Sequence, residues 1–278
     1  MKKFLSLILA LLCVLSVFCG CSSYQELNVN QSETTTTEEA TEPETPPSHT
    51  NTKEPKDIVK IYMDNIDVWK ANAESTEWYG YLFLDLDFDG VLELVSSVCR
   101  GTGFFSENKY YKANLDTNTV SEIPFPNKNS SMECDLTGID YPQLYKNNAT
   151  GKLKYLMYDN MRNGAANTTT TISELWMDEN GNVATKNLWT FNYAAESYNV
   201  QGVYTYMTYD EDGKAITITE SEYDELLEQY EIANTNLKME FKTVSGYGTI
   251  ESDYSDFHAL DYNSQTELLL ESYNAFKY

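Results

Sequence analysis

Clusters of Asn, Asp and Gly recur at an even spacing and constrain the fold of this chain more than any other feature. They begin near residues 85, 116, 147, 178 and 210. Each cluster separates two runs in which aromatic or β-branched residues alternate with polar ones, as in half-buried strands. Because Asn, Asp and Gly tolerate the positive φ angles of tight hairpins, the pattern predicts an antiparallel β-meander. A true repeat architecture is the alternative, although the residues between the turns do not repeat.

Helical patterns flank these strands on both sides. Pro55 suits the first position of a helix, and the apolar residues after it recur at steps of three and four, which is typical of one buried helical face. These residues are Ile58, Ile61, Tyr62, Ile66 and Trp69. Near the other end, Thr219 and Glu222 match the capping-box pattern that begins a helix, and Ser264 and Glu267 match it again. The predicted fold class is therefore α+β: an antiparallel β-meander sheet with an N-terminal helix and C-terminal helices.

Residues 1–20 have the pattern of a signal segment. A positive start at Lys2 and Lys3 precedes the apolar run "FLSLILALLCVLSVF", which is shorter than the roughly 20 residues that a membrane-spanning helix needs. In "FCGCSS" the Gly before Cys21 resembles a bacterial lipobox, which implies that Cys21 is the lipidated first residue of a mature lipoprotein. An ordinary cleaved signal peptide is the alternative. With lipid on Cys21, the protein is expected at the extracytoplasmic face of the cell membrane.

Residues 21–53 and 54–278 differ in composition. The first segment begins at the expected lipid anchor and is rich in Thr, Glu and Pro, with too few apolar side chains to offset the entropy of ordering. We expect it to be a disordered tether. The second segment is long enough for a sizeable core and contains no further linker of this kind, so a single extracytoplasmic domain is expected there.

The formal charge of −24 limits the partners. A chain this acidic is repelled by nucleic acid and by anionic lipid headgroups. No nucleic-acid partner is expected, and neutral or cationic partners are favoured.

Two cysteines remain when the signal segment and Cys21 are set aside. They are Cys99 and Cys134. Outside the cytoplasm this pair is a candidate disulfide. Two buried free thiols are the alternative.

The first turn cluster, "LDLDFDGVLELV" at residues 84–95, has the residue types of a calcium loop. Calcium loops offer oxygen ligands at positions 1, 3, 5, 7 and 9, with a Gly at 6 for the sharp bend. The residues at those ligand positions are Asp85, Asp87, Asp89, Val91 through its carbonyl, and Glu93. Converging carboxylates without a cation would repel one another. Ser96 stands where a helix-loop-helix site has its bidentate Glu, so we expect a weak, structural calcium site; a solvated turn is the alternative.

Two resemblances rest on this stretch. "DLDFDGVLELV" is similar to the calcium hairpins of integrin-type propeller repeats, the FG-GAP-like motif. More closely, "YLFLDLDFDGVLELVSSVCRGTGFFSENKYY" resembles a group of uncharacterised Gram-positive bacterial lipoproteins, which carry a lipobox, a tether and a strand that ends in an acidic loop. The resemblance implies a location and a domain organisation, and it implies no particular reaction.

Residues for catalysis are scarce. The chain contains only two histidines, His49 and His258, which excludes a multi-histidine zinc site and means that a Ser-His-Asp triad would need His258. The sequence contains no Gly-x-Ser-x-Gly elbow and no phosphate loop. Glycan hydrolysis by a pair of carboxylates stays an alternative, but a non-catalytic domain is favoured.

A binding role has some support from one strand. In "LWTFNY" the side chains of Trp189, Phe191 and Tyr193 share one face, and flat aromatic rings beside carboxylates suit sugar rings. The alternative is that these three rings form the core face of the sheet. The expected function is thus a binding or scaffold domain with one calcium-stabilised hairpin, whose partner is a glycan or another surface protein.

Overall fold

The structure is a computed structural model that describes residues 53–73, 77–100, 105–126, 142–162, 166–196, 201–247 and 256–278. The signal segment, Cys21, the tether up to residue 52 and Cys134 lie outside the described residues. In the described part of the chain, no helix is long and apolar enough to cross a membrane.

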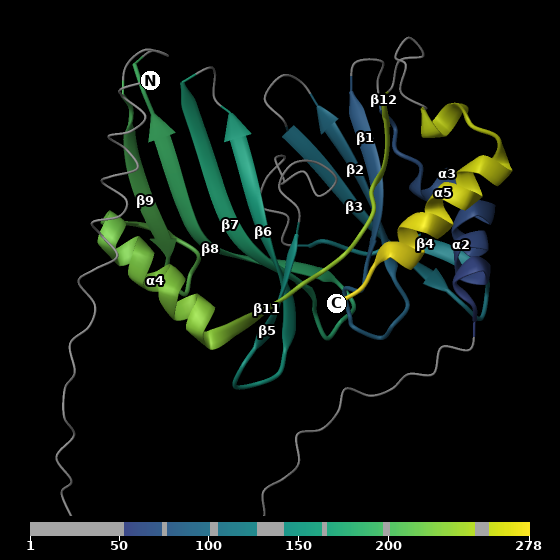
Figure 1. The fold of residues 1–278 in the computed structure, drawn as a ribbon, viewed down its shortest axis with the longest axis horizontal. Coiled ribbons are helices and arrows are strands. Elements are labelled where there is room, and N and C mark those ends of the chain that lie inside the picture. Colours follow the sequence, from purple (N-terminus) through teal and green to yellow (C-terminus); the bar gives the residue numbers. More distant parts are fainter. Residues whose placement is uncertain are drawn as a thin grey trace, which may run out of the picture. The chain divides into compact units, whose positions relative to one another are not determined.

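Two antiparallel sheets form the centre of the fold (Figure 1). The first has the order β12-β1-β2-β3-β4 and the second the order β10-β9-β8-β7-β6-β5-β11. The strands of the first sheet are β1 (Trp78–Leu84), β2 (Glu93–Arg100), β3 (Phe105–Asn114), β4 (Thr119–Glu122) and β12 (Val244–Tyr247). Those of the second are β5 (Gln143–Asn147), β6 (Leu153–Arg162), β7 (Asn167–Met177), β8 (Val183–Ala194), β9 (Val203–Tyr209), β10 (Ala215–Ile218) and β11 (Asn234–Leu237).

Each predicted turn cluster joins two antiparallel strands that are neighbours in the chain. The hairpins are β1–β2, β3–β4, β5–β6, β7–β8 and β9–β10. Each turn contains at least one residue with a positive φ angle: Phe88 and Gly90, Asn118, Gly151, Gly181 and Gly213 respectively. The α+β class and the hairpins are confirmed, and the meander is divided between two sheets.

The helices differ from the sequence prediction at two points. The single N-terminal helix is interrupted at Asn65, giving α2 (Pro55–Asp64) and α3 (Ile66–Trp69). The side-chain amide of Asn65 donates to the carbonyl of Ile61, so a local side-chain hydrogen bond accompanies the break.

The capping box at Thr219 is confirmed at the start of α4 (Glu220–Ala233). The predicted box at Ser264 is wrong, because α5 (Tyr262–Ala275) begins earlier and its N-cap is Asp261. The Asp261 carboxylate accepts from the backbone N–H groups of Asn263 and Ser264. An Asp thus satisfies the first free N–H groups before Ser264 is reached.

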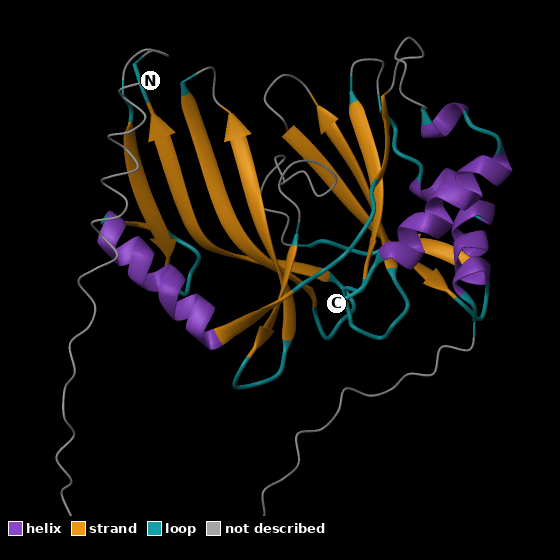
Figure 2. Cartoon of the chain, viewed as in Figure 1, coloured by secondary structure: helices purple, strands orange, loops and turns teal. Residues whose placement is uncertain are grey.

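Three hydrophobic clusters hold these elements together. The first packs α2, α3 and α5 against the first sheet, and includes Tyr62, Trp69 and Phe83. The second lies between the two sheets, and the third lies between the second sheet and α4. Figure 2 shows α4 beside the second sheet and the other helices beside the first. A short 3-10 helix, η2 (Phe257–Ala259), adds the buried Phe257 to the first cluster.

Candidate metal centre

The acidic loop at residues 85–92 connects β1 to β2, whose last and first residues, Leu84 and Glu93, pair directly. The side chain of Leu86 is buried between the sheets, and Phe88 packs against the same cluster. The alternating residues Asp85, Asp87 and Asp89 form the candidate metal group. One carboxylate oxygen from each lies within 4.8 Å of the others. The bend of the chain between Asp85 and Gly90, with positive φ angles at Phe88 and Gly90, brings the three carboxylates together.

The backbone of this loop is held from several elements. Tyr155 of β6 donates a hydrogen bond to the carbonyl of Asp85 at 2.9 Å. At the other end of the loop, Tyr62 of α2 donates to the carbonyl of Leu92 at 3.0 Å. The hydroxyl of Tyr273 on α5 accepts from the N–H of Leu92 at 3.3 Å. Hydrogen bonds from the second sheet and from two helices therefore hold the backbone at both ends of the loop.

Hydrogen bonds within the loop orient the carboxylates. Asp89 accepts from the N–H of Val91 at 2.7 Å, and Asp85 accepts from the N–H of Gly90 at 3.2 Å. Phe88 and Gly90 have positive φ angles of 58° and 81°. The left-handed conformation is costly for Phe88, and its packing against the core offsets that cost.

Lys112 of β3 contributes a positive charge to this group. Its Nζ atom contacts Asp87, lies 3.0 Å from Asp89 Oδ2 and lies 3.2 Å from Glu93 Oε1. The sequence interpretation missed this residue. The register explains its position: Leu94 pairs with Tyr111, so Glu93 and Lys112 stand opposite each other one step further along the two strands.

Burial changes the acidity of two carboxyl groups. Asp85 is 3% exposed, and burial raises its pKa to about 6, with the charges of Asp87 and Asp89 adding to the effect. Glu93 is fully buried, and its pKa rises to about 8 because burial outweighs the opposing charge of Lys112. Burial also disfavours the charged form of Lys112, but the carboxylates of Glu93 and Asp87 outweigh it, so the pKa of Lys112 stays above its usual value.

Buried oxygen atoms in the site remain without hydrogen bonds. Oδ1 of Asp85 and Oε1 of Glu93 have no hydrogen-bond donor among the described residues, although Lys112 lies near the latter. The other oxygen of Glu93, Oε2, accepts from the N–H of Leu86 at 2.8 Å. A buried carboxylate oxygen without a donor is costly, and a bound cation would remove that cost.

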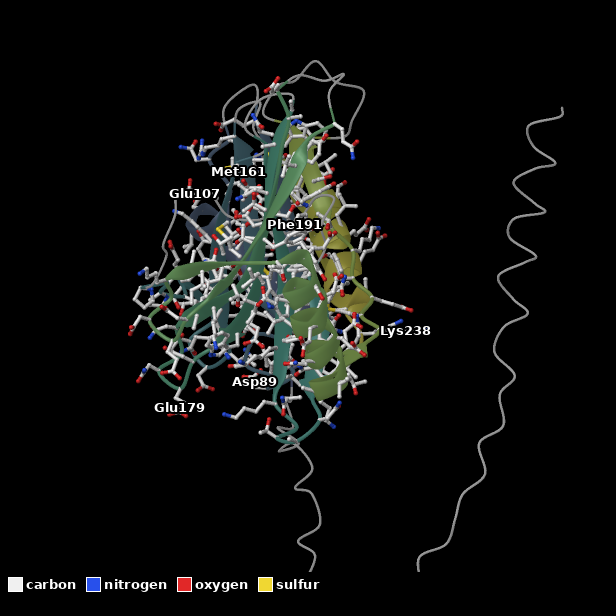
Figure 3. The ribbon with its side chains drawn as sticks, turned by 90° about the vertical axis from the view of Figure 1, so that its left-hand side faces the viewer. Asp89, Glu107, Met161, Glu179, Phe191 and Lys238 are labelled. Atoms are coloured by element: carbon white, nitrogen blue, oxygen red, sulfur yellow. The ribbon has the colours of Figure 1, made fainter. Side chains whose placement is uncertain are left out.

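The five predicted ligands have different positions relative to this group. Asp85, Asp87 and Asp89 lie together, as the sequence pattern indicated. Glu93 lies beyond them, turned toward Leu86 and Lys112. For Val91 the structure shows the N–H bonded to Asp89, and its carbonyl remains a predicted ligand. Asp89 lies toward the same end of the molecule as Glu179 and away from Met161 (Figure 3).

The three aromatic residues predicted to bind a partner are buried to different degrees. Trp189 is 5% exposed and packs edge-on against Tyr223 and Tyr230 of α4. Trp189 therefore belongs to the core face of the sheet, as the alternative interpretation of these rings expected. Phe191 and Tyr193 are half-buried, and further along the same sheet face, Tyr204 of β9 is 54% exposed, with its ring centroid 5.0 Å from that of Tyr193.

The remaining candidate residues belong to other parts of the fold. Cys99 is half-buried on β2, and its predicted partner Cys134 lies outside the described residues, so the disulfide stays a prediction. His258 lies in η2, packed against β1.

Comparison of the chain with protein-family models, with curated proteins and with solved structures found no match.

Proposed function

We propose that this protein is a non-catalytic binding or scaffold domain, held at the extracytoplasmic membrane face by lipid on Cys21, and that its β1–β2 hairpin binds one calcium ion as a structural cofactor. The location rests on the signal pattern and the lipobox-like residues of the sequence. The calcium site rests on the geometry of the aspartate group.

The observation that carries the calcium site is the excess of negative charge around Lys112. The carboxylates of Asp85, Asp87 and Asp89 lie within 4.8 Å of one another, and Lys112 is the one lysine among the described residues that pairs with this group. Asp85 is also shielded from water, and its Oδ1 has no donor in the described part of the chain. Such an arrangement favours a cation because burial weakens the competing interaction of the carboxylates with solvent.

The ligand chemistry favours a hard cation. The group consists of carboxylate oxygens and contains no histidine or cysteine, so it suits calcium or magnesium better than zinc or copper. Calcium takes six to eight oxygen ligands in an irregular geometry, whereas magnesium demands a near-octahedral shell. A short loop with three carboxylates fits calcium at the weak end of the range known for extracellular modules.

Calcium would stabilise the junction between the sheets. The hairpin joins two inner strands of the first sheet, and its Asp85 carbonyl accepts from Tyr155 of the second sheet. An ion bound to the three aspartates would therefore restrain a loop that contacts both sheets. We propose that this keeps the surrounding surface rigid for a partner.

Thermal melting with and without calcium tests the site. With calcium at about 100 times the dissociation constant, binding adds about 2.7 kcal/mol to the free energy of unfolding, and a domain of this size gains about 2–4 °C for each kcal/mol. We expect the melting temperature to rise by about 5–10 °C at that concentration, which is about 10–100 mM calcium for a dissociation constant of about 0.1–1 mM. Asp87→Asn should remove at least half of that rise, because it replaces one of the three carboxylates of the group.

The matched control is Asp116→Asn, which makes the same change of charge in the β3–β4 turn. This variant should keep the full calcium response. An unchanged melting temperature of the unmodified protein in calcium of up to about 100 mM would contradict the proposed site.

A further inference from the structure

We infer that Lys112 sets the affinity of the hairpin for calcium, because its ammonium group and the ion compete for the same carboxylate oxygens. This inference rests on the proposed function. It assigns to one residue of β3 the control of a site built on the β1–β2 hairpin.

The contacts of Lys112 carry the first step. Its Nζ atom contacts two of the three aspartates of the metal group, Asp87 and Asp89, and also reaches Glu93. A divalent ion bound among the same oxygens would lie within a few ångströms of the ammonium group. Two positive charges at that distance repel strongly when water is partly excluded, so calcium binding requires the ammonium group to withdraw.

The second step is that Asp85 offers the ion a position that Lys112 does not occupy. Asp85 makes no ion pair with Lys112, its side chain is buried, and its Oδ1 has no hydrogen-bond donor among the described residues. One of its oxygens nevertheless lies within 4.8 Å of oxygens of Asp87 and Asp89. The ion can therefore be anchored at Asp85 while it replaces Lys112 on the other two aspartates.

The third step is that Lys112 has a route to solvent. Its side chain is 32% exposed, and the long flexible stem of a lysine allows the ammonium group to move into water while the methylenes stay packed. The metal-free hairpin is thus held by an internal cation, and calcium replaces it. Because the two states share the same carboxylates, neither leaves the full negative charge unopposed.

Calorimetric titration of the full-length chain with calcium chloride tests the inference. In Lys112→Met the chain length is similar and the charge is absent, so we expect the dissociation constant for calcium to fall by about 10-fold or more. Lys112→Arg keeps the charge and should remain within about 3-fold of the unmodified protein. A matched control is Lys109→Met on the opposite face of β3, where Lys109 forms a 3.9 Å ion pair with Glu122 and no other ion pair within the described residues.

The outcomes separate the inference from the proposed function. If the unmodified protein binds calcium and Lys112→Met binds it equally well, the inference is wrong and the calcium site stands. If only Lys112→Met binds calcium, the competition is supported and the proposed native function is wrong. If neither binds calcium, both are wrong. If Lys109→Met gains as much affinity for calcium as Lys112→Met does, the gain comes from the change in net charge alone. That result would contradict the inference.

A second measurement, on the chain that keeps Lys112, covers the case in which Lys112→Met does not fold. Lysines labelled by reductive ¹³C-methylation give one NMR signal each, and the Lys112 signal is identified by its loss in Lys112→Arg. We expect this signal to shift as calcium is added, with the same midpoint as the heat of binding. A Lys112 signal that stays in place through calcium saturation would overturn the inference.

Discussion

His258 is held as a neutral side chain by its contacts with β1. Its ring stacks on that of Tyr79 with the centroids 4.0 Å apart, and its Nε2 atom lies 2.7 Å from the hydroxyl of Tyr81. Burial lowers the pKa of His258 to about 4, the charge of Lys70 adds to this, and Asp256 opposes it. The folded protein therefore resists protonation of this ring at a pH where the unfolded chain accepts it.

This difference predicts a loss of stability in acid. The unfolded pKa, about 6.5, lies above the folded one, so the contribution of His258 is fully present above pH 6.5 and is lost as the pH falls toward 4. Allowing for the partial solvent exposure of His258, we expect this residue to lower the free energy of unfolding by about 1–2 kcal/mol over that range. Urea unfolding between pH 7 and pH 4 measures it.

His258→Gln serves as the reference because it keeps a hydrogen-bonding group and cannot titrate. Asp85 and Glu93 have raised pKa values, so their effect on the pH dependence of stability has the opposite sign. Both residues are present in the unmodified protein and in His258→Gln, so the difference in stability between these two proteins isolates the effect of His258. Equal pH dependence of the two proteins would show that His258 makes no such contribution.

Several secondary-structure elements begin or end at side-chain hydrogen bonds close to their boundaries. The hairpin turns at Asp178 and Asp210 are closed by carboxylates that accept from backbone N–H groups of the same turn. Helix α4 begins with both hydrogen bonds of the capping box between Thr219 and Glu222. None of its residues is buried, although Tyr223 in its first turn packs against Trp189, so the cap adds to a modest amount of packing at the start of the helix.

Thr219→Ala should therefore lower the free energy of unfolding by about 1 kcal/mol. Chemical denaturation followed by circular dichroism measures the change. Ser264→Ala is the comparison, because Ser264 lies inside the first turn of α5 and Asp261 is the cap there. We expect it to cost less than half as much. An equal or larger loss in Ser264→Ala would contradict the assignment of Asp261 as the cap.

At the scale of the whole molecule, the acidic hairpin is where the two sheets are joined by hydrogen bonds as well as by apolar packing. Tyr155 of the second sheet donates to the Asp85 carbonyl, and Met177 of β7 donates its N–H to the Leu86 carbonyl at 3.3 Å. The ring of Tyr155 also stacks on that of Phe88, with centroids 5.8 Å apart. The candidate metal group and the contact between the sheets thus share one loop.

Tyr155→Phe keeps the ring contact and removes the hydroxyl. Because the Asp85 carbonyl loses a buried donor, we expect the free energy of unfolding to fall by about 1–2 kcal/mol. Tyr145→Phe is the matched control, since among the described residues its hydroxyl bonds to Gln143 of the same strand and to no other group, and it should cost less. Urea denaturation compares them, and a Tyr155→Phe protein as stable as the original would show that this bond does not couple the sheets.

Features that depend on neighbours in the chain were predictable from the sequence. The five hairpins, the α+β class, the cap at Thr219 and the grouping of Asp85, Asp87 and Asp89 all follow from residue types a few positions apart. Turn geometry, side-chain alternation and capping act over that distance, so each pattern specifies its own local structure.

The tertiary structure decided the features that depend on residues far apart in the chain. The division of the strands into two sheets, the burial of Trp189 under α4 and the pairing of Glu93 with Lys112 depend on which strand faces which and in what register. A shift of one residue would turn Lys112 to the other face of its sheet. The sequence by itself therefore determined the acidic loop, and only the packing of distant strands placed the ammonium group of Lys112 against its carboxylates.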